Sequence, residues 1–271
     1  MKSNSGLDFR MKEYEKRNRY YLQKRVPVIC RLDMRTGHTV LRDFKRPFDE
    51  VFIKSMQETA KCLCENVMGA KIAYTQSDEI TLVLVDYEKL DTDVFFDYRV
   101  DKLCSVTASM ATLAFNKALI KNVEGFYKEH TIFNEYEDRA EIVFDAEENE
   151  KLYSVYREAI EKGAMFDCRC FNIPKEEVTN AVYWRQVDAS RNSVQMVGQA
   201  YFSHNELHEK SNSDIQDMLM LQKGINWNNY PTHQKRGSCV IKKDGKWVVD
   251  LEIPIFKGDG RQYIEKLINF D

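Results

Sequence analysis

VICRLDMR at residues 28–35 and AYTQSDEITLVLV at residues 73–85 set the framework of this chain. Both segments are rich in apolar and β-branched residues, which predicts strands, and each presents an acidic residue at its edge, Asp33 and Asp78. A buried carboxylate is costly unless it is paired or binds a cation. Two carboxylates on neighbouring strands can hold Mg²⁺, which favours oxygen ligands and works alongside substrate phosphates. The pair therefore predicts phosphoryl or nucleotidyl transfer; an ordinary turn or cap role for each Asp is the alternative.

The order of the predicted elements indicates a fold class. Strands are expected at 26–33, 70–75, 79–86 and 165–171, with helices from Asp49 to about Met68 and over 93–121. This order predicts an α+β protein with the βαββαβ arrangement of ferredoxin-like folds. The first and third strands are central neighbours in that arrangement, so the topology can bring Asp33 and Asp78 together.

The C-terminal part predicts further elements. Helices are expected at 175–202, at 213–222 before Gly224, and at 260–270, with a hairpin over 235–251 that turns at Asp244-Gly245. No repeat or low-complexity linker divides the chain, so we expect one continuous unit.

The charge balance limits the class of partner. The chain has 271 residues, 43% hydrophobic and 31% charged, with a net charge of −3, which is typical of a globular protein and argues against a general polyanion binder. Residues 10–25 form a local basic patch with interleaved tyrosines that can follow phosphates and stack on bases; a solvated helix is the alternative. Residues 135–150 hold eight acidic residues and one Arg, which predicts a solvent-facing element away from nucleic acid.

The cysteines and the chain ends bear on the compartment. Seven cysteines are present, and neither the pair Cys62 and Cys64 nor the pair Cys168 and Cys170 has zinc-ligand spacing with partners nearby in the sequence. We therefore expect reduced core thiols in a cytoplasmic protein. The polar N-terminus predicts no signal peptide, and we expect neither an apolar run of membrane-spanning length nor a membrane partner.

Six motifs, taken together, resemble the tRNA-histidine guanylyltransferase family. They are RLDMRTGH at 31–38 (family "RIDGRxFH"), FKRPFD at 44–49 ("FxKPxD"), YTQSDE at 74–79 ("YxQSDE"), FDCR at 166–169 followed by Pro174 ("FDxR…P"), YWRQVD at 183–188 ("WRQxD") and KRGS at 235–238 ("RKGT"). The motifs follow one another in the family's order, which is far more specific than any one of them.

The resemblance implies a polymerase-palm-like core that adds nucleotides to the 5′ end of tRNA in the 3′–5′ direction. Residues 1–145 would hold this core with the basic N-terminal helix, and residues 146–271 would continue it and add an RNA-facing helical and hairpin extension. The 5′ end is activated with ATP, and the 3′-hydroxyl of GTP or another NTP then attacks it. The resemblance also implies a homotetramer.

Most site residues follow by position in or beside the motifs, whereas Lys102 comes from the helix expected at 93–121 and Lys12, Lys16 and Arg17 come from the basic patch at 10–25. Two Mg²⁺ ions would be held by Asp33, Asp78 and the Met34 carbonyl, while Glu79 would ligate metal or orient Asp78. Triphosphate or the tRNA 5′ end would contact charged and polar side chains, of which Arg forks suit phosphate best: Arg31, Arg35, His38, Ser77, Lys102 and Arg169. Contacts to the body of the tRNA are expected from Lys12, Lys16, Arg17 and Asn192.

Departures from the motifs refine the reading. Met34 replaces the Gly of "RIDGR", so the local backbone must tolerate a side chain. Ser190 and Met196 replace the His and the final Asn of the eukaryotic "HINxxxN" motif, and only Asn192 matches. This loss favours the bacterial, archaeal and phage guanylyltransferase-like proteins, which resemble templated tRNA 5′-end repair enzymes. The alternatives are guanylate addition to tRNA-histidine, a palm-type cyclase acting on free NTP, and a non-catalytic tRNA-binding module.

Overall fold

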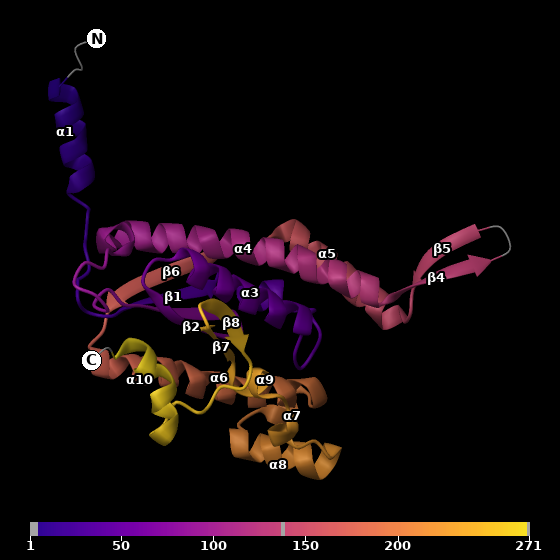
Figure 1. Ribbon diagram of the computed structural model, residues 1–271. Coiled ribbons are helices and arrows are strands. Elements are labelled where there is room, and N and C mark those ends of the chain that lie inside the picture. Colours follow the sequence, from indigo (N-terminus) through magenta and orange to yellow (C-terminus); the bar gives the residue numbers. More distant parts are fainter. Residues whose placement is uncertain (1–4, 137–138, 270–271) are drawn as a thin grey trace.

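The computed structural model describes residues 5–136 and 139–269, which build a mixed α/β body with two projections (Figure 1). The body contains a six-stranded antiparallel sheet of order β6-β1-β3-β2-β7-β8. Its strands are β1 (Val28–Met34), β2 (Ala70–Gln76), β3 (Glu79–Leu84), β6 (Phe166–Asn172), β7 (Ser238–Lys243) and β8 (Lys246–Asp250). The order β6-β1-β3-β2, with α3 (Glu50–Asn66) and α4 (Val100–Glu129) as the connecting helices, confirms the βαββαβ core.

Helices cover both faces of this sheet, with α4 on one side and α6 (Val178–Tyr201) on the other (Figure 1). The side chains of Leu32 and Met34 pack in the core beneath α3 and α4, whereas Ile29 packs in a second core with α6 and α10 (Gln262–Ile268). This division follows from the strand period of two, which sends successive side chains to opposite faces.

Local signals start and end several elements as the sequence predicts. The Asp49 carboxylate accepts a hydrogen bond of 2.9 Å from the Phe52 N–H and caps α3. Gly224 ends α8 (Asn212–Lys223) with φ 67°, a left-handed conformation that glycine adopts without steric cost. The remaining α-helices of the described residues are α1 (Ser5–Lys16), α2 (Gly37–Val40), α5 (Glu147–Lys162), α7 (His204–Leu207) and α9 (Thr232–Arg236).

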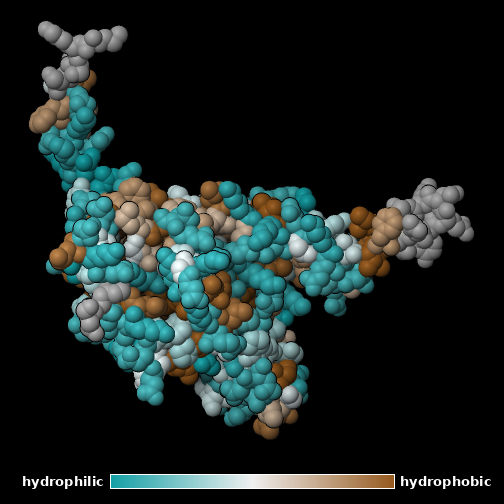
Figure 2. All heavy atoms as spheres, in the orientation of Figure 1, coloured by the Kyte–Doolittle hydropathy of each residue, from teal (hydrophilic) through white to brown (hydrophobic). Residues whose placement is uncertain are grey.

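An insertion between α4 and β6 is not predicted by the sequence patterns. It consists of the two-stranded hairpin β4 (Thr131–Tyr136) and β5 (Arg139–Phe144), followed by α5. The hairpin projects from the body and carries exposed apolar side chains, among them Ile132, Phe133 and Ile142 (Figure 2). The acidic stretch 135–150 lies within this insertion, and its residues 137–138 fall outside the described part.

Two predictions about helices need correction. The basic N-terminal helix ends at Lys16, so Arg17 and the later basic residues of 10–25 lie beyond it. The helix α4 is long and apolar enough to cross a membrane by length and composition, contrary to the expectation that no run approaches that length. This is weak evidence for a membrane span, because α4 buries a stripe at helical spacing against the sheet and α3, as a core helix does: Leu103, Thr107, Ala111, Phe115, Leu119 and Val123.

Candidate active site

Acidic residues meet at the end of the sheet where the central strand β1 finishes. Asp33 on β1 lies in register with Glu79 on β3 and with Asp167 on β6. Residues in register on antiparallel strands share a face, so the three carboxylates form a row on the α6 side. Asp167 was not among the predicted site residues, although it lies in the FDCR motif; the strand pairing shows its place beside Asp33.

Asp78 joins this row from the tight turn between β2 and β3. The Met34 N–H donates a 3.0 Å hydrogen bond to the Asp78 carbonyl, which ties the turn to the end of β1. Gly37 packs so closely that a Cβ there would lie 2.1 Å from Asp78 Oδ2. The glycine therefore permits the approach of α2 to the Asp78 carboxylate. The turn also requires φ 47° at Ser77.

Met34 shows how the chain accommodates its departure from the family glycine. Its side chain is buried in the core under α3 and α4, on the face opposite Asp33. The backbone at Met34 keeps its strand pairing with Phe166. The substitution therefore adds apolar packing and leaves the main chain at the site free of a clash.

The electrostatics of the site favour a cation. Burial raises the pKa of Asp33, and the charges of Asp78, Glu79 and Asp167 raise it further. Burial also raises the pKa of Asp78. Hydrogen bonds from its own backbone and from Ser77, and the charge of the nearby His38, lower that pKa but do not cancel the effect of burial. Crowded carboxylates that resist ionisation are stabilised by a bound cation, and an all-oxygen donor set suits Mg²⁺.

The carboxylates do not form a complete coordination shell. Among the described residues, the carboxylate oxygens of this site do not include three that lie within 4.8 Å of one another. Three ligand atoms come that close only in a group of cysteines elsewhere in the described part. Asp33 and Asp78 can supply the protein ligands of a hard cation, with the other positions filled by water and substrate. Mg²⁺ ordinarily keeps several waters and takes substrate phosphates, so a partial protein shell is what it requires.

Glu79 is engaged by an arginine of α6. Its Oε2 accepts hydrogen bonds from Gln76 Nε2 at 2.9 Å and from Arg185 Nε at 2.9 Å, with a second contact from the same guanidinium. Arg185 also donates to Asp188 at 3.0 Å. Two nitrogens of the Arg185 guanidinium therefore hold one carboxylate oxygen of Glu79 through charge-assisted hydrogen bonds.

The same helix motif anchors other parts of the site. The Arg31 and Arg185 guanidinium groups both lie over the Trp184 ring, 5.8 and 4.7 Å from its centroid. The side chain of Gln186 donates to the Pro254 carbonyl at 2.8 Å and accepts from the Phe256 N–H at 2.9 Å. YWRQVD thus fixes α6 both to the sheet and to the C-terminal segment.

A pocket of about 330 Å³ opens beside the turn that carries Asp78. His38, Gln76 and Ser77 form its wall nearest the carboxylates, and Asn192 contributes from α6. Its other walls supply cations that were not predicted, although the motifs FKRPFD and KRGS adjoin or contain them: Arg42, Lys45, Arg46 and Lys235. An oxygen-rich edge beside a cationic pocket suits a polyphosphate ligand.

Lys235 and Gly237 shape the rear of this pocket. Lys235 is buried, burial lowers its pKa, and Nζ donates to the Asn228 carbonyl at 2.5 Å. Gly237 has φ 80°, and a Cβ there would lie 2.5 Å from the Thr75 carbonyl oxygen. The glycine of KRGS therefore lets the chain enter β7 directly against β2.

The predicted arginines take different positions. Arg31 and Arg169 lie in register on the face that carries Asp33, and the buried Nε of Arg31 has no hydrogen-bond partner in the described part of the chain. The Arg169 guanidinium forms an ion pair with Asp167, with 3.7 Å between Nη2 and Oδ1. Arg35 follows β1 directly and is exposed, with its N–H bonded to the Met165 carbonyl at 2.8 Å.

Lys102 does not join the site. Thr112 of α4 accepts from the Phe166 N–H at 3.0 Å, near the Asp33 end of the sheet. Lys102 lies ten residues earlier on the helix, about 15 Å away along its axis, and α4 covers the face opposite Asp33. The sequence pattern placed Lys102 on the correct helix but could not give its end or its face.

The tRNA-contact candidates also separate. Lys12 and Lys16 are exposed on α1, which projects from the body, and Arg17 follows it (Figure 1). Asn192 lies instead at the pocket, 3.5 Å from Asp188 Oδ2. The residues predicted to contact tRNA therefore lie in two separate places, on or beside the projecting helix α1 and at the pocket beside α6.

Comparison with known proteins places these features in a family. The family model described as tRNAHis guanylyltransferase matches residues 8–174, which span the βαββαβ core and both carboxylate segments. The chain belongs to the tRNA(His) guanylyltransferase family. It is accordingly a nucleotidyltransferase that processes tRNA, and 3′–5′ addition to tRNA is the activity of the family.

Similar structures and relatives support this placement. A bacterial tRNA(His) guanylyltransferase-like protein in complex with ATP has a TM-score of 0.79 and 38% identity, covering 98% of this chain and all of that one. A second, in complex with GTP, has a TM-score of 0.71 and 33% identity over 97% of this chain and all of that one. A probable tRNA(His) guanylyltransferase of Dictyostelium discoideum is 26% identical, covering 82% of this chain and 77% of that protein.

Proposed function

We propose that this protein repairs tRNA 5′ ends by template-dependent 3′–5′ addition of nucleotides, with two Mg²⁺ ions and activation by ATP. The observation that carries the chemistry is the pairing of Asp33 with Asp78, whose turn neighbour Ser77 lines the cationic pocket. The bacterial relatives that were solved with ATP and with GTP support both nucleotides as substrates. The seven free cysteines support a reducing, cytoplasmic setting.

The two steps balance as phosphoryl transfers. The tRNA 5′-monophosphate attacks the α-phosphate of ATP and releases pyrophosphate, which leaves an adenylylated 5′ end. The 3′-hydroxyl of the incoming NTP then attacks the tRNA 5′-phosphate and releases AMP. Mg²⁺ held by Asp33, Asp78 and the Met34 carbonyl would supply charge neutralisation for both transfers.

The residues of the chain position these groups. Asp33, Asp78 and the Met34 carbonyl would hold the metal, and the clamp from Arg185 keeps Glu79 fixed beside them. Ser77, His38 and the basic walls of the pocket would bind the triphosphate, with Arg31, Arg35 and Arg169 receiving the 5′ end. Phosphoryl transfer depends largely on positioning and charge neutralisation, so this division of labour is sufficient.

Two observations favour repair over guanylate addition to tRNA-histidine. The structures of bacterial guanylyltransferase-like proteins share 38% and 33% identity with this chain, against 20% for the Saccharomyces cerevisiae tRNA(His) guanylyltransferase. The eukaryotic His is replaced by Ser190, whose hydroxyl donates a hydrogen bond of 2.9 Å to the Gln186 carbonyl of its own helix. We further propose a homotetramer, as the family resemblance implies.

The decisive experiment is an addition assay on tRNAs that lack one or two 5′ nucleotides. Each tRNA is prepared with all four bases opposite the gap and is incubated with ATP, Mg²⁺ and the four NTPs, with Asp33→Ala as the inactive control. Repair predicts that the added nucleotide follows the opposing base. Addition of guanylate alone, and to tRNA-histidine alone, would establish the alternative activity.

A further inference from the structure

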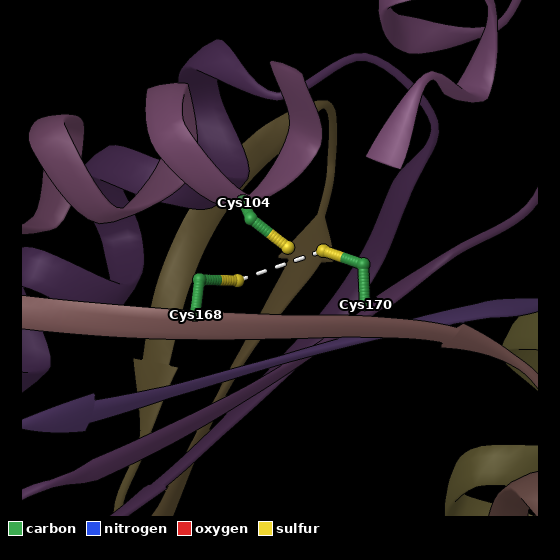
Figure 3. A group of neighbouring side chains, drawn as sticks. All are labelled: Cys104, Cys168 and Cys170. Carbon is green, nitrogen blue, oxygen red and sulfur yellow. Dashed lines mark hydrogen bonds between the residues drawn. The ribbon is translucent and has the colours of Figure 1, made fainter. Parts of the chain in front are cut away.

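Four cysteines from three elements meet between α4 and the sheet, on the face opposite the carboxylates. Figure 3 shows three of them, Cys104, Cys168 and Cys170. Cys168 and Cys170 are two apart on β6 and therefore share a face, and Cys30 on β1 lies in register with Cys170. Cys104 approaches them from α4. The sequence shows no zinc-ligand spacing because these partners come from distant positions in the chain.

Three of the sulfur atoms are mutually as close as a single metal ion would hold them, and Cys30 adds a fourth sulfur beside Cys170. The Sγ atoms of Cys104, Cys168 and Cys170 all lie within 4.8 Å of one another. Cys168 and Cys170 are 3.6 Å apart, and Cys30 Sγ is 3.3 Å from Cys170 Sγ. Four sulfurs at 2.3 Å from a tetrahedral zinc ion are separated by about 3.8 Å, which is close to these spacings.

The surroundings are those of a ligand site more than of inert core thiols. Cys104, Cys168 and Cys170 are partly buried and Cys30 is fully buried beneath them, whereas Cys64 and Cys239 are buried singly, outside the cluster. The hydroxyl of Thr107 donates to Cys168 Sγ at 3.2 Å, the kind of outer contact that orients a metal ligand. A disulfide would use two of these sulfurs and leave the convergence of the others unexplained.

We propose that Cys104, Cys168 and Cys170, with Cys30 as the fourth sulfur, form a structural zinc site. Thiolates favour this ion, and four of them complete a closed tetrahedral shell with no position for substrate. The site would fasten the start of α4 to β6 and β1. Those two strands carry Asp167 and Asp33 on their other face, so the metal would hold the framework of the active site without taking part in the reaction.

The test measures metal directly. The full-length chain, purified in a reducing buffer without chelator, should contain about one zinc per chain by mass spectrometry of the metal. Cys104→Ser should lower bound zinc at least ~10-fold, because changes in outer-shell contacts alone cost that much. Cys62→Ser is the matched control, a partly buried cysteine outside the cluster, and should retain the zinc.

Cobalt titration of the unaltered, zinc-stripped chain makes the test independent of folding defects in the variants. Thiolate-to-cobalt charge-transfer absorption with tetrahedral ligand-field bands is expected, and Asp33→Ala should leave it unchanged because carboxylates give no such band. The proposal is overturned if the protein as purified lacks zinc and cobalt produces no charge-transfer band. A Cys30–Cys170 disulfide in protein purified under reducing conditions would also overturn it.

Discussion

The two faces of one strand serve different purposes in this protein. Along β1, Leu32 and Met34 enter the apolar core beneath α3 and α4, while Arg31 and Asp33 face α6 with the charged residues of the site. Neighbours in the sequence are thus separated by the thickness of the sheet. Substitutions one position apart on β1 should therefore change different observables, activity on one face and stability on the other.

The largest effect is expected on the charged face. Asp33→Ala and Asp78→Ala each remove a proposed metal ligand and should lower nucleotide addition at least ~10³-fold, equivalent to about 4 kcal/mol of transition-state stabilisation. The midpoint of thermal unfolding without Mg²⁺ should not fall, because each change relieves repulsion among the crowded carboxylates. Addition is measured under single-turnover conditions, with the exposed Asp217→Ala as control.

Near-normal turnover in both variants would remove the metal assignment. A matched fall in thermal stability and activity would instead mean that the carboxylates act as structural caps of the turn, the alternative that the sequence left open.

On the apolar face, Leu32→Ala should reverse this outcome. Leu32 is fully buried, and truncating a buried Leu costs about 3 kcal/mol of unfolding free energy. Denaturant unfolding should show this loss, while the rate of addition by the folded fraction changes little. A comparable loss of stability from Arg31→Ala, its neighbour on the other face, would contradict the separation of the two faces.

The sequence predicts this separation well because it depends on the strand period. The βαββαβ order, the Asp49 cap and the pair Asp33 and Asp78 all follow from local patterns. The cysteine cluster does not, since it forms only after β1, β6 and α4 pack together. The β4–β5 hairpin was not predicted, because the acidic composition of the segment is typical of a solvated element and indicates no strands.

The clamp on Glu79 offers a sharper test of the charged face. Arg185→Ala would leave Glu79 partly buried without its guanidinium partner, which should cost about 2 kcal/mol of unfolding free energy and also slow addition. Arg185→Lys should recover only part of both effects, since a point charge does not reproduce the fork. The exposed Arg191→Ala on the same helix is the control, and equal stability of the two alanine variants would show that the clamp has no energetic role.

The smallest effect is expected from α1, which lies outside both faces. Lys12 and Lys16 already pair with Asp8 and Glu13 at 2.9 Å, so the net attraction of the helix for phosphate is reduced. Changing Lys12, Lys16 and Arg17 together to Ala should weaken tRNA binding about tenfold at low salt, about 1.4 kcal/mol, and should lower the salt dependence of the binding constant. Lys61, Lys151 and Lys162, which form similar ion pairs on other helices, provide a triple-Ala control. If both triple variants show the same salt dependence as the unaltered protein, α1 is a solvated helix and tRNA binding depends on the pocket side of the sheet alone.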